Sequence, residues 1–330
     1  MWQPIKKRTY FLFPLLVFSL FTPSHAEKKP LIRVSVLEFG TVNWTLATIK
    51  SNKLDIKNGF NLVIQPLAST QAGKISLQTN AADIIVSDWT WVARQRGMAS
   101  DYLFAPYSST AGAVVVNGQS TIRNIDQLVG KRLGIAGGPL DKNWLLLRAL
   151  ALKQGIDLDK DVEKIFAAPP LLNHLMQQGK LDALINFWHY NARLKADGYR
   201  QLFDTYDIIH QLGIDTKLPI LGYVFRNSWA RSQPTIINKF LSASRQSADL
   251  LCNSDEHWSA ITPLTRTTDV ATQVLHRQDY CNGRVKPLTA TDSQSIADVY
   301  SILVDVGGEE LVGPNKQLDL RLFWNESNEH

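Results

Sequence analysis

From Leu31 onward, short β-branched runs alternate with longer segments of helical periodicity, and this alternation limits the fold more than any other feature of the chain. The runs LIRVSVLEF, FNLVIQPL and DIIVS are typical of buried strands, and single helical segments separate them. Strands joined by one crossover helix each predict a parallel sheet with helices on both faces. The pattern begins again after NGQSTIRNIDQLVG, so the 330 residues predict two α/β lobes.

The chain becomes predominantly helical toward its C-terminus. A helix-rich segment with little sheet of its own has to bury its apolar faces on another part of the protein, and we expect it to pack on the first lobe. The first lobe is then discontinuous and comprises residues 27–118 and 225–330, whereas the second comprises residues 119–224. Two strands that cross between the lobes, near residues 112–120 and 216–226, are expected to act as hinges.

Residues 1–26 have the three parts of a secretion signal. The basic run KKR precedes an apolar stretch, and small residues precede an expected cleavage site after Ala26. The alternative is a membrane anchor, but the apolar stretch is short for a bilayer span and is interrupted by Pro14. We therefore expect an exported, periplasmic protein.

Two cysteines, Cys252 and Cys281, are the only ones in the sequence. In an oxidising compartment we expect them to form one disulfide, which would stabilise the fold by about 2–4 kcal/mol. The alternatives are two free thiols or a metal site, and the histidines lack the spacing that zinc sites need. The formal net charge of +5 includes the basic leader, and the other basic residues are scattered, so the sequence does not predict nucleic-acid binding.

In open α/β sheets, ligands bind where the carboxyl ends of the strands meet the N-termini of helices. At these points the sequence places tryptophans, small hydroxyl side chains, glycines and carboxylates. The candidate ligand-binding residues of the first lobe are Glu38, Phe39, Thr41, Asn43, Trp44, Ser69, Thr70, Asp88, Trp89, Ser109 and Thr110. Those of the second lobe are Gly137, Gly138, Asp141, Trp144, Asn186 and Trp188.

Each of these residue types also has a structural explanation. Tryptophans after a strand often fill the core between helix and sheet, and Asp88 and Asp141 are well placed to cap helices. The sequence contains no dinucleotide-binding fingerprint, no Walker loop and no nucleophile elbow. It also offers no nucleophile with an adjacent base and no metal-ligand spacing. The sequence therefore favours ligand binding over catalysis, with no cofactor and no metal.

The segments IRVSVLEFGTVNW, ISLQTNAADIIVSDW and IDQLVGKRLGIAGGPLDKNWLLLRAL, in this order, resemble the periplasmic solute-binding proteins of ABC transporters. The resemblance is to the nitrate/sulfonate/taurine type, which includes binders of thiamine-precursor pyrimidines. It implies a type II periplasmic binding protein fold, in which two α/β lobes joined by two hinge strands close on a ligand. It also implies that Asp88 and Trp89 face Gly138, Asp141 and Trp144 across the cleft. The closed form would deliver its ligand to a membrane permease and its ATPase.

The charges of the expected cleft bear on the ligand. Glu38, Asp88 and Asp141 outnumber Lys142, the only nearby base, and acids beside tryptophans favour a cationic or heteroaromatic ligand. Backbone N–H groups could still hold a sulfonate, and taurine carries both charges. We therefore expect a monomeric receptor for an amine-bearing, sulfonate/taurine-like or heteroaromatic nitrogen compound. The alternatives are an enzyme on the same fold that acts on a small heterocycle and a periplasmic ligand sensor.

Overall fold

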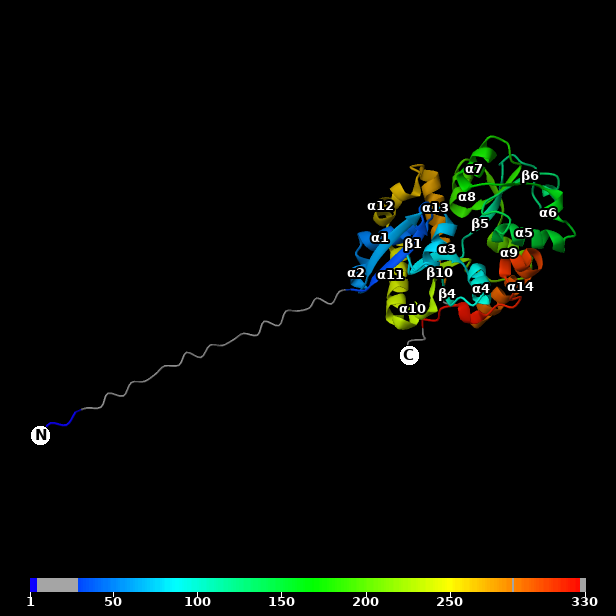
Figure 1. Ribbon diagram of the computed structural model, residues 1–330. Helices are drawn as coiled ribbons and strands as arrows, with labels where there is room; N and C mark the ends of the chain where they lie inside the picture. Colours follow the sequence, from blue (N-terminus) through cyan, green and yellow to red (C-terminus); the bar gives the residue numbers. More distant parts are fainter. Residues whose placement is uncertain (5–28, 287, 327–330) are drawn as a thin grey trace.

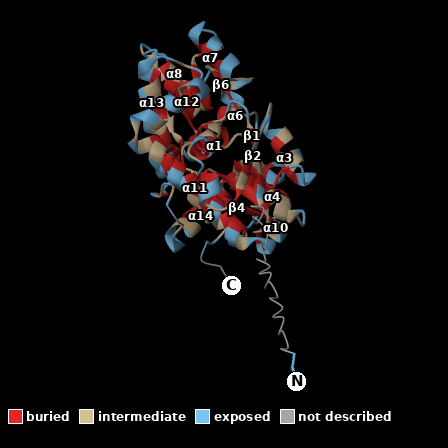
Figure 2. Ribbon diagram, turned by 90° about the vertical axis from the view of Figure 1, so that its left-hand side faces the viewer, coloured by how far each residue is buried: buried red, intermediate tan, exposed pale blue. Residues whose placement is uncertain are grey.

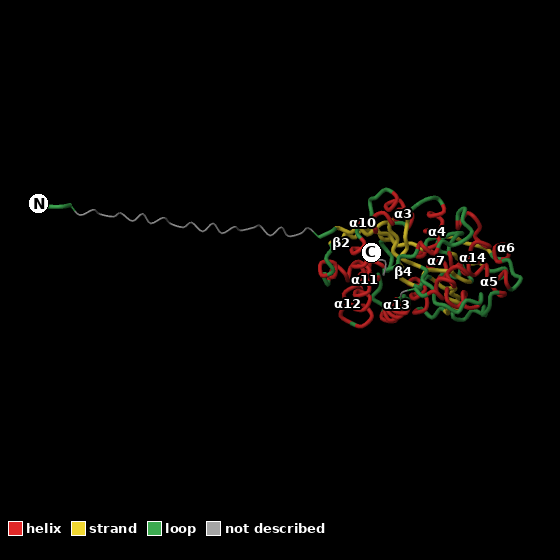
Figure 3. Tube along the Cα trace, turned by 90° about the horizontal axis from the view of Figure 1, so that it is seen from below, coloured by secondary structure: helices red, strands yellow, loops and turns green. Residues whose placement is uncertain are grey.

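The structure is a computed structural model that describes residues 1–4, 29–286 and 288–326. The expected cleavage site after Ala26 and most of the expected secretion signal lie outside the described residues. The chain forms two five-stranded sheets in two lobes, one drawn mainly in blue and yellow and the other in green (Figure 1). Helices surround the strands of both sheets (Figure 3). The prediction of two α/β lobes is therefore confirmed.

The two sheets have the same strand arrangement. The first sheet consists, in spatial order, of β2 (Asn61–Leu67), β1 (Leu31–Leu37), β3 (Ile84–Asp88), β10 (Leu221–Arg226) and β4 (Tyr102–Ser108). The second consists of β7 (Glu163–Phe166), β6 (Arg132–Ile135), β8 (Ala183–Phe187), β5 (Gly112–Val116) and β9 (Arg200–Asp204). The central strands are rich in Val, Ile and Leu because helices cover both of their faces. In β5, for example, every residue is buried.

Each sheet contains one strand that runs against its neighbours, so the prediction of purely parallel sheets is wrong in this detail. In the first sheet β1 is parallel to β2 and β3, whereas β10 is antiparallel to β3 and β4. In the second, β6 is parallel to β7 and β8, whereas β5 is antiparallel to β8 and β9. The two reversed strands are the first that the chain forms on entering each sheet from the other lobe. Because no crossover helix precedes them within the sheet, nothing constrains them to the parallel direction.

The helices fall into three groups along the chain. The first lobe contains α1 (Val42–Ser51), α2 (Leu54–Lys57), α3 (Thr70–Gln78) and α4 (Trp89–Gly97). The second lobe contains α5 (Lys142–Lys153), α6 (Leu158–Asp161), α7 (Pro169–Gln177), α8 (Trp188–Ala196) and α9 (Thr205–Gln211). The C-terminal group consists of α10 (Asn227–Ser232), α11 (Pro234–Asn253), α12 (Asp255–Thr265), α13 (Val270–Asn282) and α14 (Ala290–Val312).

The chain passes between the sheets twice, after β4 and before β10. β5 pairs in the second sheet, although the expected lobe boundary at residue 118 placed it in the first lobe. β10 pairs in the first sheet, although the boundary at residue 224 divided it. A strand-like run does not itself indicate which sheet it joins, because its partners are distant in sequence. On strand membership we propose a first lobe of residues 29–108 and 221–326 and a second lobe of residues 112–211, with hinges between them.

The C-terminal helices pack on both lobes, and not on the first lobe alone as expected. α11 and α12 pack on α1 of the first lobe, whereas α13 packs on α8 of the second. α14 contacts α4 of the first lobe and α5 of the second, and Figure 1 shows it beside both. Its buried side chains Val299 and Tyr300 share one core cluster with Trp89 and Trp144. The C-terminal helices thus connect the lobes outside the two hinge segments.

The same ion pair fixes β1 to the loop before β3 in the first sheet and β6 to the loop before β8 in the second. Asp83 accepts hydrogen bonds from the backbone N–H and the guanidinium of Arg33, and Asp182 accepts the same set from Arg132. In both lobes the two partners are 50 residues apart. Buried residues form the interior of both lobes and exposed residues cover the outer helix faces (Figure 2). None of the described helices combines the length and the apolar character that a bilayer span requires.

Candidate ligand-binding cleft

A cavity of about 280 Å³ lies between the lobes at the carboxyl ends of their strands. The first lobe lines it with the ends of β1 and β3 and the first turns of α1 and α3. The second lobe lines it with the first turns of α5 and α8, and both hinge segments border it through Ala111 and Ile220. Helix N-termini and loops converge at this edge of an α/β sheet, which is where such folds bind ligands. We refer to this cavity as the cleft.

Several of the candidate residues lie on the cleft. They are Thr41, Ser69, Thr70 and Asp88 from the first lobe and Gly137, Asp141 and Trp188 from the second. They come from segments far apart in the sequence, and the fold brings them to one cavity. Both lobes therefore contribute, as expected of a cleft that closes on its ligand.

Trp89 and Trp144 do not face each other across the cleft, which corrects the expectation for this pair. Trp89 is 2% exposed, and its indole N–H donates to the carbonyl of Pro219 at 2.9 Å. Trp144 is 1% exposed and lies in the same core cluster as Tyr300. A tryptophan buries a large apolar surface, and the packing of α14 against α4 and α5 offers both rings a site in the core.

Trp44, Asn43 and Asn186 also have structural roles instead of lining the cleft. The ring of Trp44 lies 5.7 Å from that of Trp188 and 5.6 Å from that of Trp258, in a cluster that joins α1, α8 and α12. The amide of Asn43 donates to the carbonyls of the loop before α1 at 2.7–3.2 Å. The amide of Asn186 donates to the carbonyl of Pro169, the first residue of α7, at 3.0 Å. These side chains hold the walls of the cleft in place.

Glu38 and Phe39 lie outside the cleft and interact with Arg266, the residue that ends α12. The Arg266 guanidinium is 3.2 Å from the Glu38 carboxylate and 3.8 Å from the centre of the Phe39 ring. All three side chains are largely exposed, so the interaction fastens the loop after β1 to the C-terminal helices with little gain in stability. Sequence spacing could not reveal it, because Arg266 is 228 residues from Glu38.

Ser109, Thr110 and Gly138 are the remaining candidates outside the cleft. The Ser109 hydroxyl donates to the carbonyl of Gly283 at 3.2 Å, and the Thr110 hydroxyl donates to that of Asp279 at 3.2 Å. These bonds attach the first hinge segment to the end of α13. Gly138 and its neighbour Gly137 have φ angles of 86° and 83°, which favour glycine in the turn before α5.

Lys74, Phe187 and His189 line the cleft but were not among the candidates. Lys74 lies four residues after Thr70 on α3, so one helical turn places both on the same face. The sequence expectation that Lys142 is the only nearby base is therefore wrong. Phe187 and His189 flank Trp188 at the start of α8, and this proximity was the signal that could have identified them.

One ion pair joins the two lobes across the cleft. The ammonium of Lys142, at the start of α5, lies 3.1 Å from the carboxylate of Asp88, at the end of β3. Burial raises the pKa of Asp88, but the positive charges of Lys142 and Lys74 outweigh this effect and lower it to about 2. Burial lowers the pKa of Lys74, against the effect of Asp88. Within the described residues, the Lys74 ammonium has no hydrogen-bond or ion-pair partner and lies 5.2 Å from the Trp91 ring.

Asp141 caps α5 and has the opposite titration behaviour. Its carboxylate accepts hydrogen bonds from the backbone N–H groups of Asn143 at 3.0 Å and Trp144 at 3.2 Å. Burial is the largest effect on this group and raises its pKa to about 6, although those hydrogen bonds and Lys142 favour the charged form. Asp88 therefore uses one oxygen on α4 and the other on Lys142, whereas Asp141 uses its Oδ1 on α5.

The helices that begin at the cleft differ in how their first N–H groups are satisfied. Side chains of Ser69, Asp88 and Asp141 cap α3, α4 and α5. Within the described residues, α1 and α8 begin without a side-chain cap, and their first residues line the cleft. Some of the first N–H groups of these two helices donate to backbone carbonyls, those of Asn43 and Trp44 to Gly40 and Thr41 and that of Trp188 to Ala111. The helix dipole still favours an anion at both helix starts.

His189 adds an uncharged imidazole to the wall of the cleft. Burial, with smaller effects of the nearby His276 and Arg193, lowers its pKa to about 3. The His189 ring is therefore neutral at neutral pH. Among the described residues, histidine, cysteine and acidic side chains do not gather in groups of three or more that could hold a metal ion.

A larger cavity of about 800 Å³ lies behind the cleft. It runs between β4, α11, residues 283–286 and Leu288, and it shares Thr41 and Trp188 with the cleft. Two of its basic residues are already paired, Arg245 with Glu326 at 2.5 Å and Arg284 with Asp249. It borders the carboxyl end of β4, but Thr41 and Trp188 are the only candidate residues that line it within the described part of the chain.

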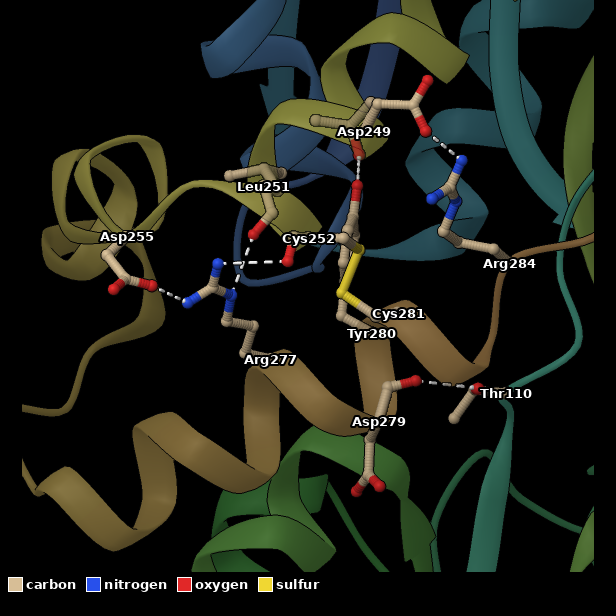
Figure 4. The surroundings of a disulfide bond; sticks show 11 residues. Thr110, Asp249, Leu251, Cys252, Asp255, Arg277, Asp279, Tyr280, Cys281 and Arg284 are labelled. Atoms are coloured by element: carbon tan, nitrogen blue, oxygen red, sulfur yellow. Dashed lines mark hydrogen bonds and ion pairs between the residues drawn. A yellow bond between two sulfur atoms is a disulfide. The ribbon is translucent and has the colours of Figure 1, made fainter.

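The expected disulfide between Cys252 and Cys281 is present (Figure 4). It joins the end of α11 to the end of α13, and Arg277 donates to the carbonyl of Cys252 at 3.1 Å beside it. α11 packs on the first lobe and α13 on the second, so the disulfide joins two helices that contact different lobes. Its role in the structure is to fix the C-terminal helices.

Solved structures share this fold at low sequence identity. The periplasmic aliphatic sulphonate-binding protein SsuA from Escherichia coli is 16% identical with a TM-score of 0.72, and the match covers 89% of this chain and 92% of that one. The alkanesulfonate-binding protein SsuA from Xanthomonas axonopodis pv. citri bound to MOPS is 17% identical with a TM-score of 0.66, covering 91% and 99%. An ABC transporter protein from Parabacteroides distasonis is 15% identical with a TM-score of 0.66, covering 89% and 99%.

The sequence itself matches one family model, described as NMT1/THI5 like, over residues 57–257. The comparison with curated proteins gave no match. The matched segment includes more than half of the chain and extends through both lobes. The chain therefore belongs to the NMT1/THI5-like family and has the fold of the periplasmic binding proteins.

Proposed function

We propose that the protein is the periplasmic receptor of an ABC importer and that it binds a small organic sulfonate in the cleft. The observation that carries this proposal is Lys74, a cleft residue whose ammonium has no hydrogen-bond or ion-pair partner among the described residues, together with the starts of α1 and α8, which have no side-chain caps there. A sulfonate offers three acceptor oxygens to the ammonium and a negative charge to the two helix starts. The sulfonate-binding proteins of the same fold support the proposal.

The acids of the cleft are a weaker argument for a cationic ligand than the sequence suggested. One oxygen of Asp88 caps α4 and the other pairs with Lys142, while Asp141 caps α5. An ammonium group on the ligand would therefore compete with Lys142 and the helix N–H groups for the oxygens of these carboxylates. MOPS carries a sulfonate and a tertiary amine, so a ligand with both charges, such as taurine, fits the proposal as well as a simple alkanesulfonate.

The size and lining of the cleft limit the rest of the ligand. A cavity of about 280 Å³ holds a small molecule with few heavy atoms. Phe187, Trp188 and Leu140 offer apolar surface to a short alkyl or aryl group. We therefore propose a sulfonate with a short carbon chain. Binding would favour the closed form, which would then deliver the ligand to a permease and its ATPase.

The ligand-binding role is tested by titration calorimetry of the wild type and Lys74→Met with ethanesulfonate, butanesulfonate, taurine, acetate, ethylamine and a thiamine-precursor pyrimidine. Loss of a charge-assisted hydrogen bond costs about 1.5–3 kcal/mol, so Lys74→Met should bind sulfonates about 10- to 100-fold more weakly. Lys180→Met, which changes an exposed lysine of the second lobe, is the matched control and should bind normally. Binding of the amine or the pyrimidine alone would refute the sulfonate assignment.

A further inference from the structure

The ion pair between Asp88 and Lys142, which we call the cleft pair, joins the two lobes across the cleft. Lys142 belongs to the second lobe and Asp88 to the first, and both line the cleft. Their side chains are 22% and 17% exposed, so water screens the attraction less than at the surface. The cleft pair therefore favours the approach of the two lobes.

The two carboxylate oxygens of Asp88 have different partners, one in the first lobe and one in the second. Its Oδ1 accepts the backbone N–H of Trp91 at 2.9 Å and the hydroxyl of Thr90, which holds the carboxylate at the start of α4. Its Oδ2 is the oxygen that lies 3.1 Å from Lys142. The carboxylate thus presents a fixed negative charge to the second lobe, as the anionic group of a bound ligand would.

A second ion pair between the lobes provides a comparison. Lys195 of α8 lies 2.9 Å from Asp279 of α13, and neither residue lines the cleft. In the same region Arg193 donates to the carbonyl of Thr265 at 2.8 Å. The ion pair belongs to the packing of α13 on α8, and the hydrogen bond joins α8 to the end of α12, so a ligand in the cleft would not compete with either.

We propose that Asp88 is an internal competitor of the ligand anion: it holds Lys142 across the cleft, and the incoming sulfonate takes over that lysine. This inference rests on the proposed function for the identity of the anion. Asp88 then has two effects. It favours the closed arrangement without ligand, and it weakens the binding of anions, so that only a ligand with further contacts to Lys74 and the helix starts displaces it. Asp88 is in this sense a residue that determines selectivity.

The binding test uses Asp88→Asn, because asparagine also caps helices and preserves the start of α4. If Asp88 competes with the ligand, Asp88→Asn should bind ethanesulfonate and taurine at least about 5-fold more tightly than the wild type, with equal gains for both. If Asp88 instead holds the ligand's ammonium group, the variant should lose affinity for taurine only. That result, or unchanged binding of both ligands, overturns the proposal. Lys195→Met is the control and should bind both as the wild type does.

The distance between the lobes tests the cleft pair without any ligand. Spin labels on Lys57→Cys and Lys180→Cys, exposed positions of α2 and of the loop before β8, report the separation of the lobes, and the native cysteines are paired with each other. Asp88→Asn and Lys142→Met should both shift the distances to longer values, whereas Lys195→Met should not. Unchanged distances would overturn the inference whether or not a sulfonate binds. An Asp88-dependent distance in a protein that binds no sulfonate would support the cleft pair and refute the proposed ligand.

Discussion

The two lobes have the same framework and different cleft faces. Their sheets have the same strand order, and the same Arg–Asp ion pair joins β1 to the loop before β3 and β6 to the loop before β8. Where β3 and β8 end, however, the first lobe has Asp88 and the second has Phe187. Residues that hold the sheet together are therefore repeated, whereas residues that face the cleft are not.

The helix starts differ between the lobes in a complementary way. In the first lobe the helix after the third strand is capped by Asp88, and the helix after the first strand has no side-chain cap within the described residues. In the second lobe Asp141 caps α5, the helix after β6, and α8, the helix after β8, has no side-chain cap within the described residues. The first lobe thus offers the cleft two capped helix starts, those of α3 and α4, and the uncapped start of α1, whereas the second lobe offers one start of each kind. We infer that the uncapped starts of α1 and α8 attract the ligand anion and that the caps of α4 and α5 hold the lobes in register.

The lobes also differ at the fifth residue of α3 and of α7, which is Lys74 in the first lobe and Asn173 in the second. Lys74 of α3 lines the cleft with its ammonium unpaired among the described residues. Asn173 of α7 donates to the carbonyl of Tyr190 at 2.9 Å and accepts from Asn186 at 2.8 Å, so its side chain is used within the second lobe. At this helix position, therefore, the first lobe has a charged cleft residue and the second lobe a neutral side chain bonded within the lobe.

The largest expected effect on stability is that of the disulfide. It joins two C-terminal helices, and the second lobe has no cysteines to form one of its own. Replacing Cys252 and Cys281 by serine should lower the free energy of unfolding by about 3–4 kcal/mol, because a loop of 29 residues is no longer closed in the unfolded chain. Urea unfolding followed by circular dichroism measures this loss. An unchanged midpoint would show that the disulfide contributes little to the fold.

The Arg–Asp ion pairs sharpen the comparison between the two sheets. The Asp83 side chain is 9% exposed, whereas that of Asp182 is 32% exposed. Asp83→Ala should therefore cost about 2 kcal/mol or more, since it leaves Arg33 and its backbone N–H without their partner, and Asp182→Ala should cost less. Equal losses for the two variants in urea unfolding would contradict the difference in burial between the two sites.

The two capping aspartates should respond to pH with opposite signs. The pKa of Asp88 is lowered from 3.8 to about 2, so its ionised form adds stability that is lost as pH falls from about 4 to about 2. The pKa of Asp141 is raised from 3.8 to about 6, so stability is lost as pH rises from about 4 to about 6. At pH 7, Asp88→Asn should destabilise the protein, and Asp141→Asn should stabilise it by about 1 kcal/mol.

Unfolding of both variants at pH 7 and at pH 4 measures these differences. Asparagine caps helices about as well as aspartate, so the comparison isolates the charge. The gain from Asp141→Asn should shrink at pH 4, where the unfolded aspartate begins to take up its proton. A loss of stability for both variants at pH 7 would contradict the difference between the two caps.

The sequence predicted the alternation of strands and helices, the two lobes and the disulfide, because these depend on local periodicity and on a single pair of cysteines. It did not predict the direction of β5 and β10, since strand pairing depends on partners distant in sequence. It placed Trp89 and Trp144 on the cleft because position after a strand does not determine where a side chain points. The site of Trp89 in the core exists only because α14 packs beside it.

The charge of the cleft was misjudged for a related reason. Asp88, Asp141 and Lys142 could be counted from the sequence, but their hydrogen bonds could not. Lys74 was overlooked because it lies one turn inside a helix, whereas the candidates were taken from loops and helix starts. A rule that includes the first full turn of each helix at the sheet edge would have found it.

The most direct test of the central claim is the titration of the wild type and of Lys74→Met with ethanesulfonate. The account predicts that the wild type binds one ethanesulfonate per chain, that Lys74→Met binds it at least about 10-fold more weakly, and that Lys180→Met binds it normally. Equal affinity in the wild type and Lys74→Met, or no binding of any sulfonate by a folded wild type, would contradict the assignment of the cleft as a sulfonate site.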